Sequence, residues 1–251
     1  LAERQILARL THPHIAALLD GGITDDGTPY FVMEHVDGRP LDAYCDERQS
    51  DLGARLELFL QVCDAVAHAH RSLVVHRDLK PPNVLVDALG RVKLLDFGIA
   101  KVLDDDGQQT RADVRPMTPR YASPELLRGE TVTTAADIYS LGVLLYELLV
   151  GVSPYPAATS ETQLHRLVCD VDAPPPSRRA TRAVDADDDL LARARRRATT
   201  PQLLRERLQG DLDTIVGMAL HKDPLRRYRS VDDLAADLRR HRDDLPVTAR
   251  P

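Results

Sequence analysis

Residues 76–83 have the sequence HRDLKPPN and decide the fold of this chain. A long helical pattern precedes them and the apolar run at residues 84–86 follows, so we expect a loop between a helix and a strand. Asp96 comes thirteen residues after Asn83, behind a second apolar run. The two runs can pair as a hairpin across residues 87–91. Such a hairpin would bring Asp96 close to the loop.

Four side chains would then share one patch of surface: Asp78, Lys80, Asn83 and Asp96. Three of them supply hard oxygen atoms, and the fourth is a cation. Carboxylate and amide oxygens are ligands for magnesium, and an ammonium group neutralises phosphate charge. The patch therefore suits magnesium and phosphate chemistry. A helix, loop and hairpin with solvated charges is the alternative interpretation.

The loop and the residues after the second run resemble two motifs of protein kinases. HRD at residues 76–78, followed by Asn83, is similar to the catalytic loop, and DFG at residues 96–98 is similar to the magnesium-binding motif. Lys80 is typical of the serine/threonine branch. The chain thus resembles bacterial eukaryotic-like (Hanks-type) serine/threonine protein kinases. This implies an α+β fold of two lobes, mainly the helical large lobe plus a remnant of the β-rich small lobe.

The resemblance implies catalytic and metal-binding roles, with ATP and Mg²⁺ as cofactors. Asp78 would orient the incoming hydroxyl group and accept its proton, and Lys80 would steady the γ-phosphate as charge develops. Asn83 and Asp96 would hold Mg²⁺ between the phosphates. Thr118 would hydrogen-bond Asp78 and Lys80 and favour hydroxyl substrates of the Ser/Thr type.

Five positions match the family's nucleotide-binding residues. Glu3 falls where a helix glutamate pairs with a strand lysine, and Met33 takes the gatekeeper position. The main chain of Glu34 and Val36 would meet the adenine edge, and Leu85 would lie beneath adenine. From the residues alone, Glu3 reads as an exposed helix carboxylate and Met33 as a core residue of an aliphatic strand.

Other residues would organise or regulate the site. His76 and Phe97 match stacked core positions of the family. Thr110 lies in the expected activation segment, and a phosphate there would pair with Arg77 and order the segment. The alternatives are an unmodified loop threonine and a purely structural role of Arg77, for which Asp137 or a loop carbonyl could serve as partner.

Two distant carboxylates are expected to hold parts of the large lobe together. Asp137, near the start of an apolar helix, would bond the catalytic loop, although helix capping alone would explain a carboxylate there. Glu125 ends a segment that resembles the kinase pattern Gly-Thr-Pro-x-Tyr-x-Ala-Pro-Glu, with Met117 in place of Gly and Ser123 in place of Ala. Its partner would be Arg227.

Composition excludes several classes of protein. The 251 residues are 43% hydrophobic and 29% charged, as is ordinary for a globular chain, and the net charge of −6 gives no reason to expect nucleic acid. The apolar run at residues 141–150 is too short to span a bilayer, and the three cysteines fit a reducing compartment. We expect a cytoplasmic, bacterial segment that contacts ATP and protein substrates but no membrane.

The chain divides into three parts by this resemblance. Residues 1–36 would be the small-lobe remnant (end of a helix, two strands and hinge), residues 37–246 the large lobe, and residues 247–251 the start of a linker with further modules beyond it. The family's glycine-rich loop and strand lysine would precede Leu1, so we expect this piece to be inactive alone.

Residues 177–209 exceed the usual kinase connection and form a charged insertion. Arginines at 195–197 and aspartates at 185 and 187–189 dominate it. A basic docking surface is one interpretation. We favour the other, a solvated and partly disordered segment.

Two functions compete with a protein serine/threonine kinase that transfers the ATP γ-phosphoryl group to protein hydroxyls. A pseudokinase or scaffold would bind partners through the same fold, but pseudokinases commonly lose one or more of the four patch residues, which are all present here. A small-molecule phosphotransferase would share the loop but usually lacks the segment at residues 118–125 and its arginine partner. We therefore expect the kinase.

Overall fold

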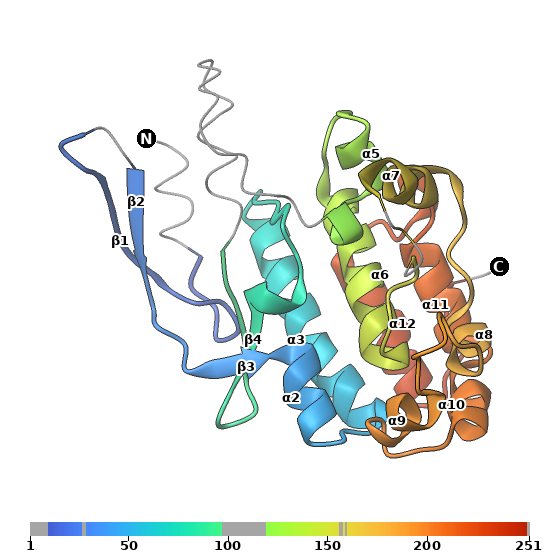
Figure 1. Ribbon diagram of the computed structural model, residues 1–251. Helices are drawn as coiled ribbons and strands as arrows, with labels where there is room; N and C mark the ends of the chain where they lie inside the picture. The colour runs from blue at the N-terminus through green and yellow to red at the C-terminus, as the bar shows by residue number, and fades with distance from the viewer. Residues whose placement is uncertain (1–9, 27–28, 97–118, 156–157, 159, 250–251) are drawn as a thin grey trace.

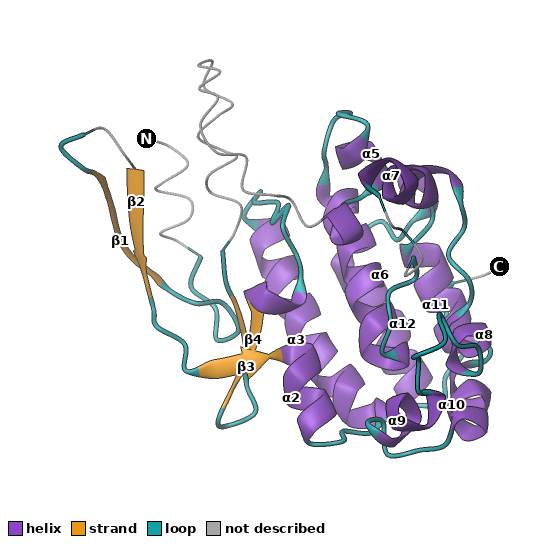
Figure 2. Ribbon diagram, viewed as in Figure 1, coloured by secondary structure: helices purple, strands orange, loops and turns teal. Residues whose placement is uncertain are grey.

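Figure 1 shows the computed structural model of the chain, which describes residues 10–26, 29–96, 119–155, 158 and 160–249. Short strands lie on one side of the molecule and a body of helices on the other (Figure 2). This is the α+β arrangement of a helical large lobe with a reduced β-rich lobe, as the sequence predicted.

The first sheet is a hairpin of β1 (Leu18–Ile23) and β2 (Pro29–Met33), paired antiparallel with Leu18 opposite Met33. The apolar run at residues 15–19 begins before β1 and overlaps it only at Leu18 and Leu19. Ile15 instead forms a parallel bridge with Leu94, and the amide of Ala16 donates to the Leu94 carbonyl at 2.9 Å. The residues before the hairpin are therefore tied to the second sheet.

The second sheet has the order β3 (Gly38–Pro40), β4 (Val84–Asp87) and β5 (Val92–Leu94), all antiparallel. β4 and β5 form the predicted hairpin. Its turn contains Gly90 at φ +76°, a conformation that glycine adopts without strain. β4 leads away from the loop at residues 76–83, and β5 returns the chain toward it.

The rest of the described chain consists of helices and the loops that join them. The helices are α2 (Leu41–Glu47), α3 (Leu52–Arg71), α5 (Pro124–Leu127), α6 (Thr134–Val150), α7 (Glu161–Asp170), α8 (Pro176–Ala180), α9 (Leu190–Arg195), α10 (Pro201–Leu208), α11 (Asp211–Ala219) and α12 (Val231–Arg242), with the 3₁₀ turns η1 (Pro81–Asn83), η2 (Pro119–Tyr121) and η3 (Pro224–Arg226). Within the described ranges, no helix has both the length and the apolar character needed to cross a bilayer.

The central helix α6 is buried nearly all round, because its residues are apolar on every face. It packs against α3 and α11, and α3 in turn packs against α12 and β5. Side chains cap the starts of α3 and α6: Asp51 accepts from the Ala54 amide at the start of α3, and Thr133 accepts from the Ala135 amide at the start of α6. The core of the helical body is therefore built around α6, as the sequence predicted.

Two buried arginines satisfy the carbonyl groups at the end of α6, which a helix leaves without internal partners. Arg197 donates from Nε to the Leu149 carbonyl at 2.7 Å and from Nη2 to the Leu148 carbonyl at 3.1 Å. Arg55 donates from Nη1 to the same Leu148 carbonyl at 3.1 Å, and its Nη2 lies 2.8 Å from Asp46. Burial lowers the pKa of Arg197 to about 9, with the charge of Arg55 adding to that shift.

The charged segment at residues 177–209 is folded, so the expectation that it is partly disordered was wrong, and only some of its charges are solvated. Residues 177–209 contain α9, α10 and most of α8, and Arg193 and Arg197 are 7% and 1% exposed. The charge pattern misled because these arginines have acceptors: Arg197 binds the end of α6, and Arg193 pairs with Asp188 at 3.1 Å. Arginine tolerates burial where its donors are matched in this way.

Residues 247–249, which the sequence assigned to the start of a linker, are anchored to the buried Asp237 of α12. Its carboxylate accepts from the amides of Thr248 and Ala249, each at 2.7 Å, and from the Tyr228 hydroxyl at 3.0 Å. Burial opposes ionisation of Asp237, but these hydrogen bonds outweigh it and lower its pKa. The described end of the chain is therefore part of the fold.

The end of α6 provides a test of this packing. Gly151, at φ +91°, closes the helix, and a Cβ there would lie 2.9 Å from Arg197 Nη1; Gly129, at φ +70°, has open space around it. Both Gly→Ala changes force an L residue into left-handed geometry, at about 1–2 kcal/mol. We expect Gly151→Ala to cost more than Gly129→Ala in urea unfolding, since only it displaces Arg197. Equal costs would contradict the proposed cap.

Candidate active site

The loop at residues 76–83 leaves α3 and is held from below by Asp137 of α6. The Asp137 carboxylate accepts from the main-chain amides of His76 at 2.8 Å and Arg77 at 2.9 Å. The ring Nε2 of His70, on α3, lies 2.8 Å from the same carboxylate. Asp137 is fully buried, so it joins α3, α6 and the loop in one hydrogen-bonded unit. Asp137 reaches Arg77 through the main chain.

The side chains of Asp78, Lys80 and Asn83 meet, as the sequence predicted. Lys80 Nζ lies 2.8 Å from Asp78 Oδ2, and Asn83 Nδ2 donates to the same oxygen at 3.0 Å and to the Asp78 carbonyl at 2.8 Å. η1 places Asn83 there, with prolines in its first turn. The Asp78 side chain remains 31% exposed, so its carboxylate is open to solvent.

Leu95, a residue that sequence reasoning passed over, brings Asp96 to this cluster. Its amide donates to the Asn83 carbonyl at 2.8 Å, and its carbonyl accepts from His76 Nε2 at 2.9 Å. The main chain just before Asp96 is thereby fixed to both ends of the loop. Pattern alone gave no signal for Leu95, because both of its bonds come from the main chain.

His76 must be neutral to make its two bonds. Nε2 donates to the Leu95 carbonyl, while Nδ1 accepts from the Asp78 amide at 3.3 Å. This requires one N–H and one lone pair, as in neutral imidazole. Burial lowers the pKa of His76 and so favours this form, against the opposing charge of Asp137. His76 therefore acts as an uncharged brace between the loop and Leu95.

Two residues of the site have strained main chains. Arg77 has φ +63° and Asp96 has φ +48°, in the left-handed region that non-glycine residues seldom adopt. Such strain costs on the order of 1–3 kcal/mol per residue and gathers at functional sites. At Arg77 the bond to Asp137 helps to hold this geometry, and at Asp96 the fixed Leu95 does so.

The oxygen donors of the cluster fit a magnesium ion. Because Asn83 uses its Nδ2 toward Asp78, its amide oxygen is left for a ligand, and the exposed Asp96 follows Leu95, whose amide donates to the Asn83 carbonyl. A hard cation that keeps part of its water shell needs only such a pair of oxygen ligands plus phosphate. The residues present therefore match Mg²⁺ in chemistry.

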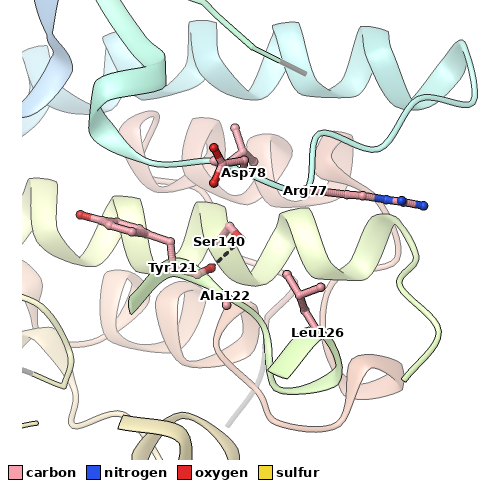
Figure 3. Close-up of a pocket in the computed structure, with 7 residues that line it drawn as sticks. Arg77, Asp78, Tyr121, Ala122, Leu126 and Ser140 are labelled. Carbon is pink, nitrogen blue, oxygen red and sulfur yellow. Dashed lines mark hydrogen bonds between the residues drawn. The ribbon is translucent and has the colours of Figure 1, made fainter. Parts of the chain in front are cut away.

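Residues 121–126 face Asp78 across a small pocket. This pocket is lined by Arg77, Asp78, Leu79, Tyr121, Ala122, Leu126 and Ser140. Figure 3 shows the Asp78 carboxylate and the Arg77 guanidinium pointing in opposite directions, and Ser140 donating to the Tyr121 carbonyl at 2.7 Å. Ser123, the departure from the kinase pattern, caps α5 by accepting from the Leu126 amide. This explains why serine is tolerated there.

Glu125 and Arg227 form the predicted bridge. Arg227 donates from Nη1 and Nη2 to the two carboxylate oxygens at 2.7 and 2.8 Å, with both residues buried. Burial opposes ionisation of Glu125, but the hydrogen bonds and charge of Arg227 outweigh it and lower the pKa of the carboxyl group. The bridge fixes α5 to the chain that directly follows η3.

The expected nucleotide-binding residues lie along the junction of the two sheets. Met33 ends β2 and Leu85 lies in β4, both half-buried, and Val36 follows in the connection to β3. Glu34 binds Lys93 Nζ at 3.0 Å and accepts from the Ala17 amide at 3.1 Å. Both bonds lower the pKa of Glu34, and the hydrogen bond from the Ala17 amide has the larger effect. Its side chain therefore serves the fold.

Four expected site residues lie outside the described residues: Glu3, Phe97, Thr110 and Thr118. Sequence reasoning also missed Tyr121 and Glu147, whose hydroxyl and carboxylate pair behind the pocket. Burial raises the pKa of Glu147, which favours the protonated acid more than in water. A carboxylate within the apolar run of α6 was the available signal.

Comparison with known proteins defines the class. The model of the protein kinase domain matches residues 1–232. The chain therefore belongs to the protein kinase family.

Proteins similar to this chain include bacterial serine/threonine kinases. The serine/threonine-protein kinase PknB of Mycobacterium tuberculosis is 34% identical over 98% of this chain and 36% of its own length. PknB of Mycolicibacterium smegmatis is 37% identical over 94% of this chain and 34% of its own length. The probable serine/threonine-protein kinase SCO3848 of Streptomyces coelicolor is 34% identical over 98% of this chain and 34% of its own length. The chain thus spans about a third of the length of these relatives.

Proposed function

We propose that the protein is a serine/threonine protein kinase that transfers the γ-phosphoryl group of ATP to protein hydroxyl groups with Mg²⁺. The observation that carries the proposal is the meeting of Asp78, Lys80 and Asn83, with Asp96 tied beside them through Leu95. Membership of the kinase family supports the same reaction.

Asp78 orients the substrate hydroxyl and takes its proton as the oxygen bonds to phosphorus. Its Oδ2 is already held by Lys80 and Asn83, which leaves Oδ1 for the hydroxyl group. Lys80 lies close enough to the reacting atoms to offset the negative charge on the transferred group. The bond from phosphorus to the β-phosphate oxygen breaks, and ADP leaves with that oxygen.

Asn83 and Asp96 are the residues that would hold magnesium. The ion supplies charge neutralisation between the phosphates. The chain's part is to fix the two ligands before ATP arrives. It does so through the bonds of Asn83 to Asp78 and of Leu95 to Asn83, which cost no reorganisation during the reaction.

The remaining assignments rest on the family pattern. Glu3 would help to position the phosphates. The adenine site would be formed by Met33, Leu85 and the main chain of Glu34 and Val36. Thr118 would select Ser/Thr hydroxyl groups. Phosphorylated Thr110 would pair with Arg77, whose guanidinium points away from Asp78 (Figure 3). That direction suits a regulatory contact rather than contact with substrate.

Transfer of label from γ-labelled ATP tests the proposal. The full-length protein is incubated with a protein acceptor and Mg²⁺, and the phosphorylated amino acids are identified after acid hydrolysis. We expect acid-stable label on serine and threonine, lost when the metal is chelated. ATP binding without transfer to any acceptor would instead favour a scaffold that uses the kinase fold.

A further inference from the structure

A second pocket lies in the region of the insertion, and its lining is almost entirely arginine. It is lined by Pro174, Arg178, Arg179 and Arg182, with a volume of about 170 Å³. α8, which carries the first two arginines, packs against α6, α10 and α11 on the side of the molecule away from the β1–β2 hairpin (Figure 1). The pocket is therefore separate from the candidate active site.

The positive charge of this pocket is not neutralised within the described part of the chain. There, no carboxylate comes within ion-pair distance of Arg178, Arg179 or Arg182. The neighbouring aspartates are used elsewhere: Asp188 pairs with Arg193 at 3.1 Å, and Asp213 accepts from the Ser177 amide at 2.8 Å. The pocket thus gathers three cations in the absence of a protein anion.

The main chain that carries these arginines is held by a buried arginine behind the pocket. Arg193, 7% exposed, donates to the carbonyls of Arg179 and Arg182 at 3.3 and 3.4 Å, so it fixes the main chain that carries them. Arg179 Nε is buried and has no hydrogen-bond acceptor among the described residues. Burial lowers the pKa of Arg193, and the like charge of Arg179 adds to the shift. An anion bound beside Arg179 would offset part of the repulsion between Arg179 and Arg193.

We propose that this pocket binds the phosphoryl group of a phosphorylated serine or threonine on a protein segment. Three guanidinium groups offer paired N–H donors to the three oxygens of a phosphate monoester, with a charge of about −1.5 to −2 to neutralise. The pocket volume of about 170 Å³ is several times the roughly 30 Å³ that one water occupies in the liquid, which leaves room for a group larger than water.

The lining favours a protein-borne phosphate over a free nucleotide. Pro174 is the one apolar residue of the lining, and no aromatic side chain is there to stack on a base. The choice of phosphoserine or phosphothreonine rests on the proposed kinase activity, which makes such groups, whereas the oxyanion chemistry does not depend on it.

Binding of a synthetic phosphothreonine peptide to the full-length protein tests the site without any need for catalysis. The peptide is titrated by fluorescence anisotropy beside its unphosphorylated form and inorganic phosphate. Arg178→Gln/Arg182→Gln removes two exposed arginines of the pocket. Arg205→Gln/Arg207→Gln removes two exposed arginines of α10 and serves as the matched control for net charge.

We expect the phosphopeptide to bind at least about tenfold more weakly to the pocket variant than to the control variant. Its unphosphorylated form should bind neither. Equal loss in both variants would overturn the proposal, because it would mean diffuse charge attraction. Inorganic phosphate binding as tightly as the peptide would overturn the protein-borne source, and failure of both ligands to bind would overturn the site.

Discussion

Asp78→Asn is expected to lower kcat by roughly 10²- to 10⁴-fold, the usual contribution of a positioned general base. Asparagine keeps the shape and an acceptor oxygen for Lys80 and Asn83, but it cannot take the proton of the substrate hydroxyl. ATP affinity should change little, since Asp78 contacts the acceptor side. Steady-state transfer from labelled ATP and nucleotide binding by calorimetry measure the two quantities separately.

An exposed carboxylate provides the control for this substitution. Asp187→Asn, in the insertion, makes the same chemical change on the surface and should leave kcat unaltered. Both variants should unfold at the temperature of the parent protein. A kcat within a factor of about two of the parent in Asp78→Asn would contradict the proposed proton acceptor, because the family of reactions requires one.

Arg227→Leu is expected to be the most damaging change to stability, at about 3–5 kcal/mol, because it leaves a buried carboxylate without its charge partner. Arg227 also donates to the carbonyls of Ala135 at 2.7 Å and His221 at 2.7 Å, so the substitution frees main-chain acceptors as well. Urea unfolding at neutral pH gives the free energy. The double variant Glu125→Leu/Arg227→Leu should recover part of the loss.

The same bridge makes stability depend on pH. The pKa of Glu125 is lowered in the folded protein, so its stabilising contribution is present above the unfolded value, roughly 4.3, and is lost as the pH falls through the folded value. The parent protein should therefore lose more stability on acidification than the double variant, as measured by urea unfolding across that range. Parallel pH profiles would contradict the ion pair as the source.

The sequence was sufficient for those parts of the site that lie close together in the chain. Asp78, Lys80 and Asn83 share one loop, and a short hairpin returns the chain to them, so pattern and turn chemistry predicted their meeting. The Glu125–Arg227 bridge was predicted from the family pattern across 102 residues, and the structure contains it.

Contacts made by the main chain and buried cations were beyond the sequence. Leu95 fixes Asp96 through its amide and carbonyl groups, which every residue carries. Arg197 looked like a solvated charge in an arginine run, yet it is 1% exposed and binds the end of α6. Whether an arginine is buried depends on acceptors far along the chain, and these are set only by the packing of α6 and the insertion.

We propose that Asn83 and Asp96 hold the magnesium of a phosphoryl-transfer site beside Asp78. Phosphate transfer to a protein acceptor by the full-length protein, measured against Mg²⁺ concentration in the parent and in Asp96→Asn, tests it most directly. We predict magnesium-dependent transfer to serine and threonine in the parent and loss of that transfer in the folded variant at every metal concentration. Undiminished transfer by Asp96→Asn, with the same magnesium dependence, would contradict the role of Asp96 as a magnesium ligand.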